Sequence, residues 1–242
     1  MITCTNLSKK FRWYDRPVSL KASFARLFRR PELSAEWYVL KDLQLKIEAG
    51  ERIGIVGRNG GGKTTLLKIL AGIYAPTTGK VSIKARRMLA LIELGAGFYP
   101  DLTGRENIRL NWALNGLLRS ELKDRLDAII DFSGVRQFLD TPMKYFSAGM
   151  RSRLAFSIAI HADPDLLILD EVLAVGDAAF QEQCYERIDL LCKNGATLLL
   201  VSHNMADIQR MCSRAIWLQD GGLKADGEVR ETIRRYLSAK IS

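Results

Sequence analysis

Hydrophobic residues follow two spacings along the chain, and the longest apolar runs mark the expected sheet. Residues 165–170 and 196–203 are nearly continuous in aliphatic side chains. Such runs are typical of parallel strands that are buried on both faces. Shorter or alternating patterns predict further strands at 1–11, 38–47, 52–56 and 80–83, and a hairpin around Asp220 within 215–226.

Helical spacing predominates in the middle of the chain. Apolar residues recur at i, i+3 and i+4 within 65–70, 106–118, 122–133, 150–160 and 229–239. Residues 93–161 hold most of this pattern, between two expected strands, which predicts an inserted helical subdomain. We therefore expect a single domain over 1–242, with its α/β core in 1–92 and 162–242.

Residues 12–37 interrupt the strand pattern and are expected to be an insertion. They contain Pro17, Pro31 and an amphipathic stretch over 20–28. The first 30 residues carry eight Lys or Arg against the single acid Asp15, within a chain of net charge +9. Such a patch suits anionic lipid headgroups, nucleic acid or an acidic partner, or is simply a solvated face. If the patch meets a membrane or an anionic ligand, we expect Arg26, Arg29 and Arg30 to contribute to that contact.

The length of 242 residues and the 48% hydrophobic content suffice for one sizeable core. The longest apolar runs fall short of the roughly 18–20 residues that cross a bilayer, and the first residues lack the pattern of a signal peptide. The four cysteines are neither paired as C-x-x-C nor arranged as a framework. We expect a soluble, cytoplasmic protein with reduced thiols.

A glycine-rich stretch after the 52–56 strand carries the clearest chemistry. Gly57, Gly62, Lys63 and Thr64 fill the pattern G-x-x-x-x-G-K-[ST], between an expected strand and an expected helix. Glycines let backbone N–H groups wrap around a phosphate, and the helix start adds its positive dipole end. Lys63 is expected to reach the terminal phosphates, and the Thr64 hydroxyl to ligate Mg²⁺. The predicted phosphate contacts are Gly57, Arg58, Asn59, Gly60, Gly61, Gly62, Lys63, Thr64 and Thr65.

Acidic and basic side chains follow the two buried strands. Asp170 ends one strand and is expected to help hold Mg²⁺, and Glu171 comes directly after it as the expected general base. His203 ends the next strand, where a contact to the γ-phosphate is needed. Because ligands bind at the carboxyl ends of parallel strands, we expect the three side chains to lie together.

A second anion site is expected at residues 147–149. Ser147, Ala148 and Gly149 form a small-residue turn before a predicted helix, so a hydroxyl and bare amides stand at a helix N-terminus. One chain cannot easily bring two such helix ends onto one nucleotide. A head-to-tail pair of chains can, which predicts a homodimer.

The ordered motifs resemble those of ATP-binding-cassette (ABC) ATPase subunits over nearly the whole chain. In that resemblance 57–65 is Walker A, 145–150 the signature, 166–171 Walker B, 174–177 the D-loop and His203 the switch histidine. It implies a P-loop NTPase fold of ABC type, with a RecA-like core, an antiparallel β-subdomain and the helical insertion. It also implies ATP and Mg²⁺ as ligands.

Several positions depart from the family pattern. The signature reads S-A-G-M rather than S-G-G-Q, and the D-loop reads A-V-G-D, with Asp177 matching its acid. Glu93 is the residue nearest to the position at which the family usually has a metal-sensing glutamine. Phe11 matches the adenine-stacking aromatic, with Trp13, Tyr14 and Tyr38 as rivals.

These departures resemble one branch, the ATPases that export bacterial O-antigen, capsule or teichoic acid. The branch implies a channel-forming membrane subunit in two copies, a lipid-linked polysaccharide as cargo and a place on the cytoplasmic face of the inner membrane. Only 39 residues follow His203, so we expect no C-terminal carbohydrate-binding domain. Nucleic acid is not an expected partner. An ABC protein acting on ribosomes or DNA, a non-hydrolytic scaffold, and an importer or drug exporter remain alternatives.

Overall fold

The computed structural model describes residues 1–14, 33–92, 97–174 and 176–241. The amphipathic stretch at 20–28, the arginines at 26, 29 and 30, and Glu93 lie outside these ranges.

A six-stranded sheet forms the centre of the molecule, in the order β5-β6-β7-β3-β8-β9. Five of its strands run parallel and β9 pairs antiparallel with β8. The bounds are β3 Arg52–Val56, β5 Met88–Leu91, β6 Leu166–Asp170, β7 Thr197–Val201, β8 Arg214–Gln219 and β9 Gly222–Glu228. Every residue of β6 and β7 is buried, as their continuous apolar runs predict.

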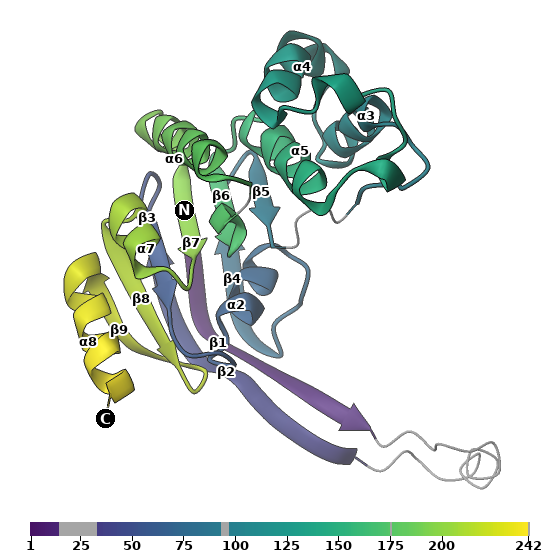
Figure 1. Ribbon diagram of the computed structural model, residues 1–242. Coiled ribbons are helices and arrows are strands. Elements are labelled where there is room, and N and C mark those ends of the chain that lie inside the picture. The colour runs from purple at the N-terminus through teal and green to yellow at the C-terminus, as the bar shows by residue number, and fades with distance from the viewer. Residues whose placement is uncertain (15–32, 93–96, 175, 242) are drawn as a thin grey trace, which may run out of the picture.

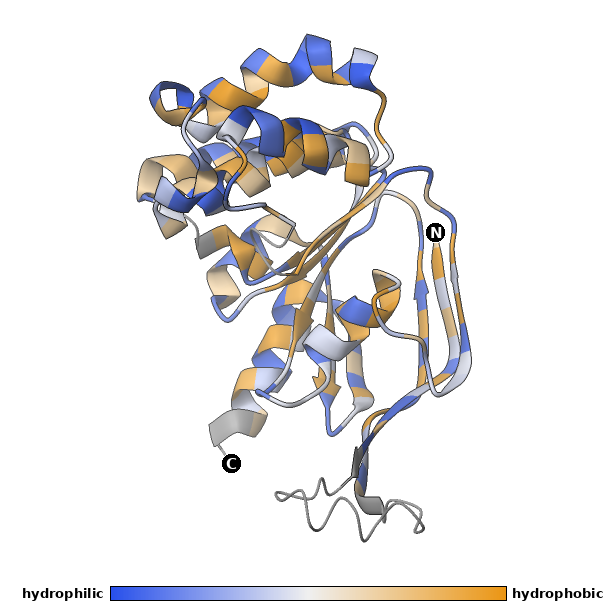
Figure 2. Ribbon diagram, turned by 90° about the vertical axis from the view of Figure 1, so that its right-hand side faces the viewer, coloured by the Kyte–Doolittle hydropathy of each residue, from blue (hydrophilic) through white to orange (hydrophobic). Residues whose placement is uncertain are grey.

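The two faces of the sheet belong to two separate hydrophobic cores. Leu166 and Ile168 of β6 pack with helix α2 (Lys63–Leu70) and the second sheet. Leu167 and Leu169 face the other way, toward the helical lobe and α6. Because successive side chains of a strand point to opposite faces, an uninterrupted run of leucines supplies both cores at once. Figure 2 shows these central strands in the hydrophobic colour.

A second, antiparallel sheet has the order β2-β1-β4, with β1 Ile2–Tyr14, β2 Leu33–Ile47 and β4 Thr78–Ile83. Strands β1 and β2 form a long hairpin that reaches well beyond the body of the molecule (Figure 1). The predicted insertion bounds of 12–37 are therefore wrong. Pairing continues through Arg12 opposite Glu36 and Tyr14 opposite Leu33, and Lys10 and Arg12 both form ion pairs with Glu36.

The helices of the middle segment gather in a lobe at one end of the sheet (Figure 1). They are α3 Gly104–Leu114, α4 Arg119–Ser133 and α5 Ala148–Ile160, with short 3₁₀ turns at Arg136–Phe138 and Met143–Tyr145. Helix α3 begins at a capping box in which Thr103 and Glu106 satisfy each other's backbone N–H groups. The sequence pattern predicted all three helices, with each start two or three residues late; the predicted ends of α4 and α5 match the structure, and that of α3 lies four residues too far along.

The remaining elements are a 3₁₀ turn at Val172–Ala174, α6 Ala178–Lys193, α7 Met205–Met211 and α8 Val229–Ile241. Strand β5 and helices α6 and α7 were not among the predicted elements. Strand β5 has four residues, too few for a pattern. Helix α6 buries about one side chain per turn, at Phe180, Cys184, Ile188, Leu191 and Cys192.

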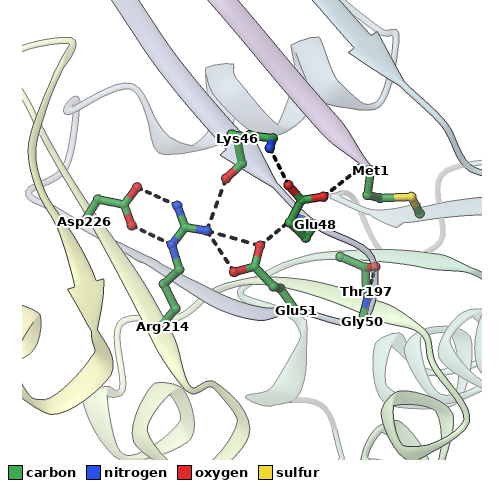
Figure 3. A network of polar contacts seen from close by, with 8 residues as sticks. All are labelled: Met1, Lys46, Glu48, Gly50, Glu51, Thr197, Arg214 and Asp226. Carbon is green, nitrogen blue, oxygen red and sulfur yellow. Dashed lines mark hydrogen bonds and ion pairs between the residues drawn. The ribbon is translucent and has the colours of Figure 1, made fainter.

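Polar contacts join neighbouring strands at the end of the sheet where β3 begins (Figure 3). The Arg214 guanidinium of β8 donates to Asp226 of β9 at 2.6 Å and to Glu51, just before β3, at 2.9 Å. These two carboxylates raise the pKa of Arg214 above its ordinary value. Arg214 also donates to the Lys46 carbonyl of β2 at 3.1 Å, so the network ties both sheets together at the end opposite to the glycine-rich loop.

Candidate functional site

The loop between β3 and α2 has a backbone that only glycine tolerates at two positions. Gly57 has φ 154° and Gly62 has φ 97°. A Cβ atom on Gly57 would lie 2.2 Å from the carbonyl oxygen of Leu218, and one on Gly62 would lie 2.8 Å from that of Val39. The close approach of β8 and β2 thus fixes the curvature of the loop.

Lys63 lies over this loop with 7% of its surface exposed. Its ammonium donates to the carbonyl oxygens of Gly57 at 2.9 Å and Arg58 at 3.1 Å. Burial lowers its pKa, which the charges of Glu171 and Asp170 partly offset. The Lys63 ammonium is therefore held inside the curve of the loop, where phosphate oxygens would accept hydrogen bonds from it.

Asp170 ends β6 with 9% of its surface exposed, and the Thr64 hydroxyl lies beside its carboxylate. Burial raises the pKa of this carboxyl. Its Oδ1 atom is buried and has no hydrogen-bond partner. An unpartnered carboxylate oxygen beside a hydroxyl suits a hard divalent cation, so the residues fit Mg²⁺.

Clusters of three or more His, Cys, Asp or Glu that would hold a metal are absent from the described part of the chain. A magnesium ion that shares phosphate oxygens and water needs no such cluster.

Glu171 and His203 contact each other across the ends of β6 and β7. The Glu171 Oε1 and His203 Nε2 atoms lie 2.7 Å apart, and both side chains are about half exposed. Glu171 has φ 57°, a left-handed conformation unusual for a non-glycine residue. Its backbone N–H donates to the Val201 carbonyl at 2.9 Å, which holds the strained residue in place. Backbone strain of this kind is found most often at functional sites.

Lys63, Glu171 and His203 border one hollow of about 500 Å³. Its lining comprises Trp37, Val39, Asn59, Gly60, Gly62, Lys63, Thr64, Thr65, Glu171 and His203. The loop, the acid and the histidine therefore meet at the carboxyl ends of the parallel strands. Trp37 was not predicted.

Phe11 stands opposite Trp37 in the β1–β2 pairing, but Trp37 is the one that lines the hollow. The Phe11 ring packs against Trp37 at 6.2 Å and Tyr74 at 5.7 Å between ring centroids. Trp37 lies in the segment predicted to be an insertion, so only the register of β1 against β2 could have found it.

The turn at 147–149 lies on the helical lobe and does not line this hollow. Ser147 caps α5, because its Oγ accepts from the Met150 N–H at 3.1 Å. Ser147, Ala148 and Gly149 are all exposed. The chain thus keeps its second helix N-terminus apart from its own phosphate loop.

Asp177 caps α6 and connects it to the helical lobe. One carboxylate oxygen accepts from the Phe180 N–H at 2.9 Å, and the other pairs with Arg153 of α5 at 2.7 Å. The Arg153 guanidinium also stacks over the Phe180 ring at 4.8 Å. The hydrogen bonds from Phe180 and Arg153 lower the pKa of Asp177. The carboxylate therefore connects α5, which begins at Ser147, to the start of α6.

A family model described as "ABC transporter" matches residues 40–174. The chain belongs to the ABC transporter family. It is 43% identical to the O-antigen export system ATP-binding protein RfbB of Klebsiella pneumoniae, over 99% of this chain and 98% of that protein. It is 35% identical to the teichoic acids export ATP-binding protein TagH of Bacillus anthracis, over 96% of this chain but 41% of that protein.

Solved ABC cassettes share the fold. The dimeric structure of the ATP-binding cassette MJ0796 in a post-hydrolysis state, bound to ADP and Pi, superposes with a TM-score of 0.74. The two chains are 21% identical over 95% of this chain and 99% of that one. The predicted ABC fold, with its α/β core, antiparallel sheet and helical insertion, is confirmed. No helix within the described ranges is long and apolar enough to cross a membrane.

Proposed function

We propose that this chain is the ATP-hydrolysing subunit of a bacterial ABC exporter that moves lipid-linked polysaccharide, with O-antigen as cargo, across the inner membrane. The relative named for O-antigen export supports the cargo, since it matches at 43% identity over nearly both full lengths. The teichoic acid relative makes that polymer the alternative cargo, although this chain spans 41% of it.

Within that role, each nucleotide site is shared by two copies of the chain. The observation that carries this proposal is the separation of the two anion-binding turns. The phosphate loop, Glu171 and His203 border one hollow, whereas Ser147 is exposed on the helical lobe. A head-to-tail pair supplies the Ser147 turn of one chain to the phosphate loop of the other. The dimeric state of a solved cassette with this fold is consistent with such a pair.

The residues of the hollow divide the work of hydrolysis. The loop amides and Lys63 hold the phosphates of ATP, and Glu171 takes the proton of the attacking water. His203 donates to the γ-phosphate. Thr64 and Asp170 would hold Mg²⁺, with Glu93 as a further proposed contact, and the ion would offset the charge of the phosphate oxygens.

Glu171 and His203 must first release each other, because their mutual bond at 2.7 Å occupies the atoms that both need. Binding of nucleotide and of the second chain favours the arrangement in which Glu171 and His203 no longer contact each other. Closure of the dimer would then pass to two channel-forming membrane subunits through the helical lobe. The protein acts at the cytoplasmic face of the membrane as a peripheral subunit.

The cargo is tested by trapping the assembled complex. Glu171→Gln protein is purified with its membrane subunit in the presence of ATP, and bound lipids are identified by mass spectrometry. We expect a lipid-linked O-antigen glycan. A bound teichoic acid precursor reassigns the cargo. Salt-sensitive binding of RNA or DNA, without a membrane subunit, contradicts the exporter assignment.

A further inference from the structure

His203 stands in a three-residue turn between β7 and α7, and little holds its own side chain. The ring is half exposed and contacts Glu171. That contact must break for His203 to reach a phosphate. The direction of the ring therefore depends on how firmly its backbone turn is held.

Asp207 of α7 contacts the residues on both sides of His203. The Ser202 hydroxyl donates to Asp207 Oδ2 at 2.9 Å, and the Asn204 side-chain amide donates to Oδ1 at 2.8 Å. The Asn204 N–H also donates to the Ser202 hydroxyl oxygen at 3.1 Å. One carboxylate thus clamps the turn at the positions directly before and after the histidine.

The same carboxylate is held from α6. The Tyr185 hydroxyl donates to Asp207 Oδ1 at 2.8 Å, and burial raises the pKa of this hydroxyl to about 12. The Arg210 guanidinium stacks over the Tyr185 ring at 4.1 Å and pairs with Glu182. Tyr185 and Asp207 border a hollow of about 260 Å³ that Glu171 and His203 also line.

We propose that Asp207 is a positioning residue for His203, with Tyr185 bracing it from α6. The carboxylate keeps the turn fixed while His203 moves from Glu171 toward the γ-phosphate. Because α6 begins at Asp177, the brace also joins the switch histidine to the helix that starts at the D-loop. This inference rests on the proposed role of His203 in hydrolysis.

The test is a double-mutant cycle on steady-state ATP hydrolysis by the assembled transporter. Asp207→Ala is expected to lower kcat about 10-fold with KM for ATP nearly unchanged, because a displaced catalytic group loses rate rather than ground-state binding. Asp207→Asn and Tyr185→Phe, which keep the shape of their side chains, should lower kcat less. Glu182→Gln is the matched control: it changes the same α6–α7 contact without touching the His203 turn, and kcat should be unchanged.

The decisive comparison uses the His203→Ala background. If Asp207 acts through the histidine, adding Asp207→Ala to His203→Ala causes no further loss. An equal loss of kcat in both backgrounds means a general structural effect and overturns the proposal. So does an unchanged kcat in Asp207→Ala, or, if that variant does not fold, in both Asp207→Asn and Tyr185→Phe. If His203→Ala itself hydrolyses ATP normally, the premise fails, and the proposal with it.

Discussion

At the scale of single residues, the site is built from groups that cost stability when no nucleotide is present. The strained backbone of Glu171, the unpartnered Oδ1 of Asp170 and the buried ammonium of Lys63 are all unfavourable on their own. Phosphate would pair with the Lys63 ammonium and a cation with the Asp170 Oδ1 atom, so nucleotide binding offsets the cost of these two groups. Nucleotide binding should therefore stabilise the fold strongly, by mass action.

Glu171→Gln should keep ATP binding and lose about 10²–10⁴-fold in hydrolysis rate, the usual size of a general-base effect. The amide can still accept a hydrogen bond from His203 but cannot take a proton from water. Radiolabelled ATP turnover, with nucleotide affinity measured in parallel, checks this. Near-normal hydrolysis would remove Glu171 from the role of base.

His161, at the end of α5, should make the fold sensitive to mild acid. It is 8% exposed, and burial lowers its pKa below the ordinary 6.5, partly offset by its contact to the Ser157 carbonyl. The nearby charges are Arg187, Asp163 and Arg125. The unfolded chain thus takes up a proton before the folded one does, so the free energy of unfolding falls as pH drops through about 6.5, by at most about 1.4 kcal/mol per pH unit.

Urea unfolding between about pH 7.5 and 5 tests this, with His161→Gln compared to wild type. The variant should lose less stability over that pH range, because glutamine takes up no proton when the chain unfolds. Parallel curves for the two proteins would contradict a buried neutral imidazole.

At the scale of elements, sequence patterns predicted the motifs that directly follow a strand. They missed the residues whose place depends on contacts between distant elements. The phosphate loop, the acids after β6 and His203 after β7 were predictable, because each motif is continuous with a strand of clear pattern. Trp37 was missed, since its place beside the loop follows from the pairing of β1 with β2. The brace at Asp207 was also missed, because it joins α6 and α7, neither of which was among the predicted elements.

The β1–β2 hairpin yields a prediction on adenine stacking. Trp37 lines the hollow whereas Phe11 packs behind it on Tyr74. Trp37→Ala should weaken ATP and ADP binding about 5- to 150-fold, from roughly 1–3 kcal/mol of base stacking. Phe11→Ala should weaken both less, by loosening Trp37 only. Titration of the intrinsic fluorescence or calorimetry measures both affinities, and a larger loss in Phe11→Ala would return the stacking role to Phe11.

At the scale of the whole molecule, the two turns that we propose to bind anions lie on different parts of one chain. The phosphate loop belongs to the α/β core, whereas Ser147 belongs to the lobe of α3, α4 and α5 (Figure 1). The link between Arg153 and Asp177 connects that lobe to the start of α6. Under the proposed function, this contact is one route by which nucleotide binding moves the lobe and, through it, the membrane partner.

The most direct test of a shared site is complementation between two inactive variants. Lys63→Ala removes the phosphate-loop cation, and Ser147→Arg blocks the turn that faces the other chain. In a mixed pair, one site carries both defects while the other combines an intact loop with an intact turn. The account predicts that each variant alone is inactive in the assembled transporter and that co-assembly restores ATP hydrolysis. If the mixture stays as inactive as its components, while nucleotide-loaded Glu171→Gln protein remains monomeric, the shared-site account is contradicted.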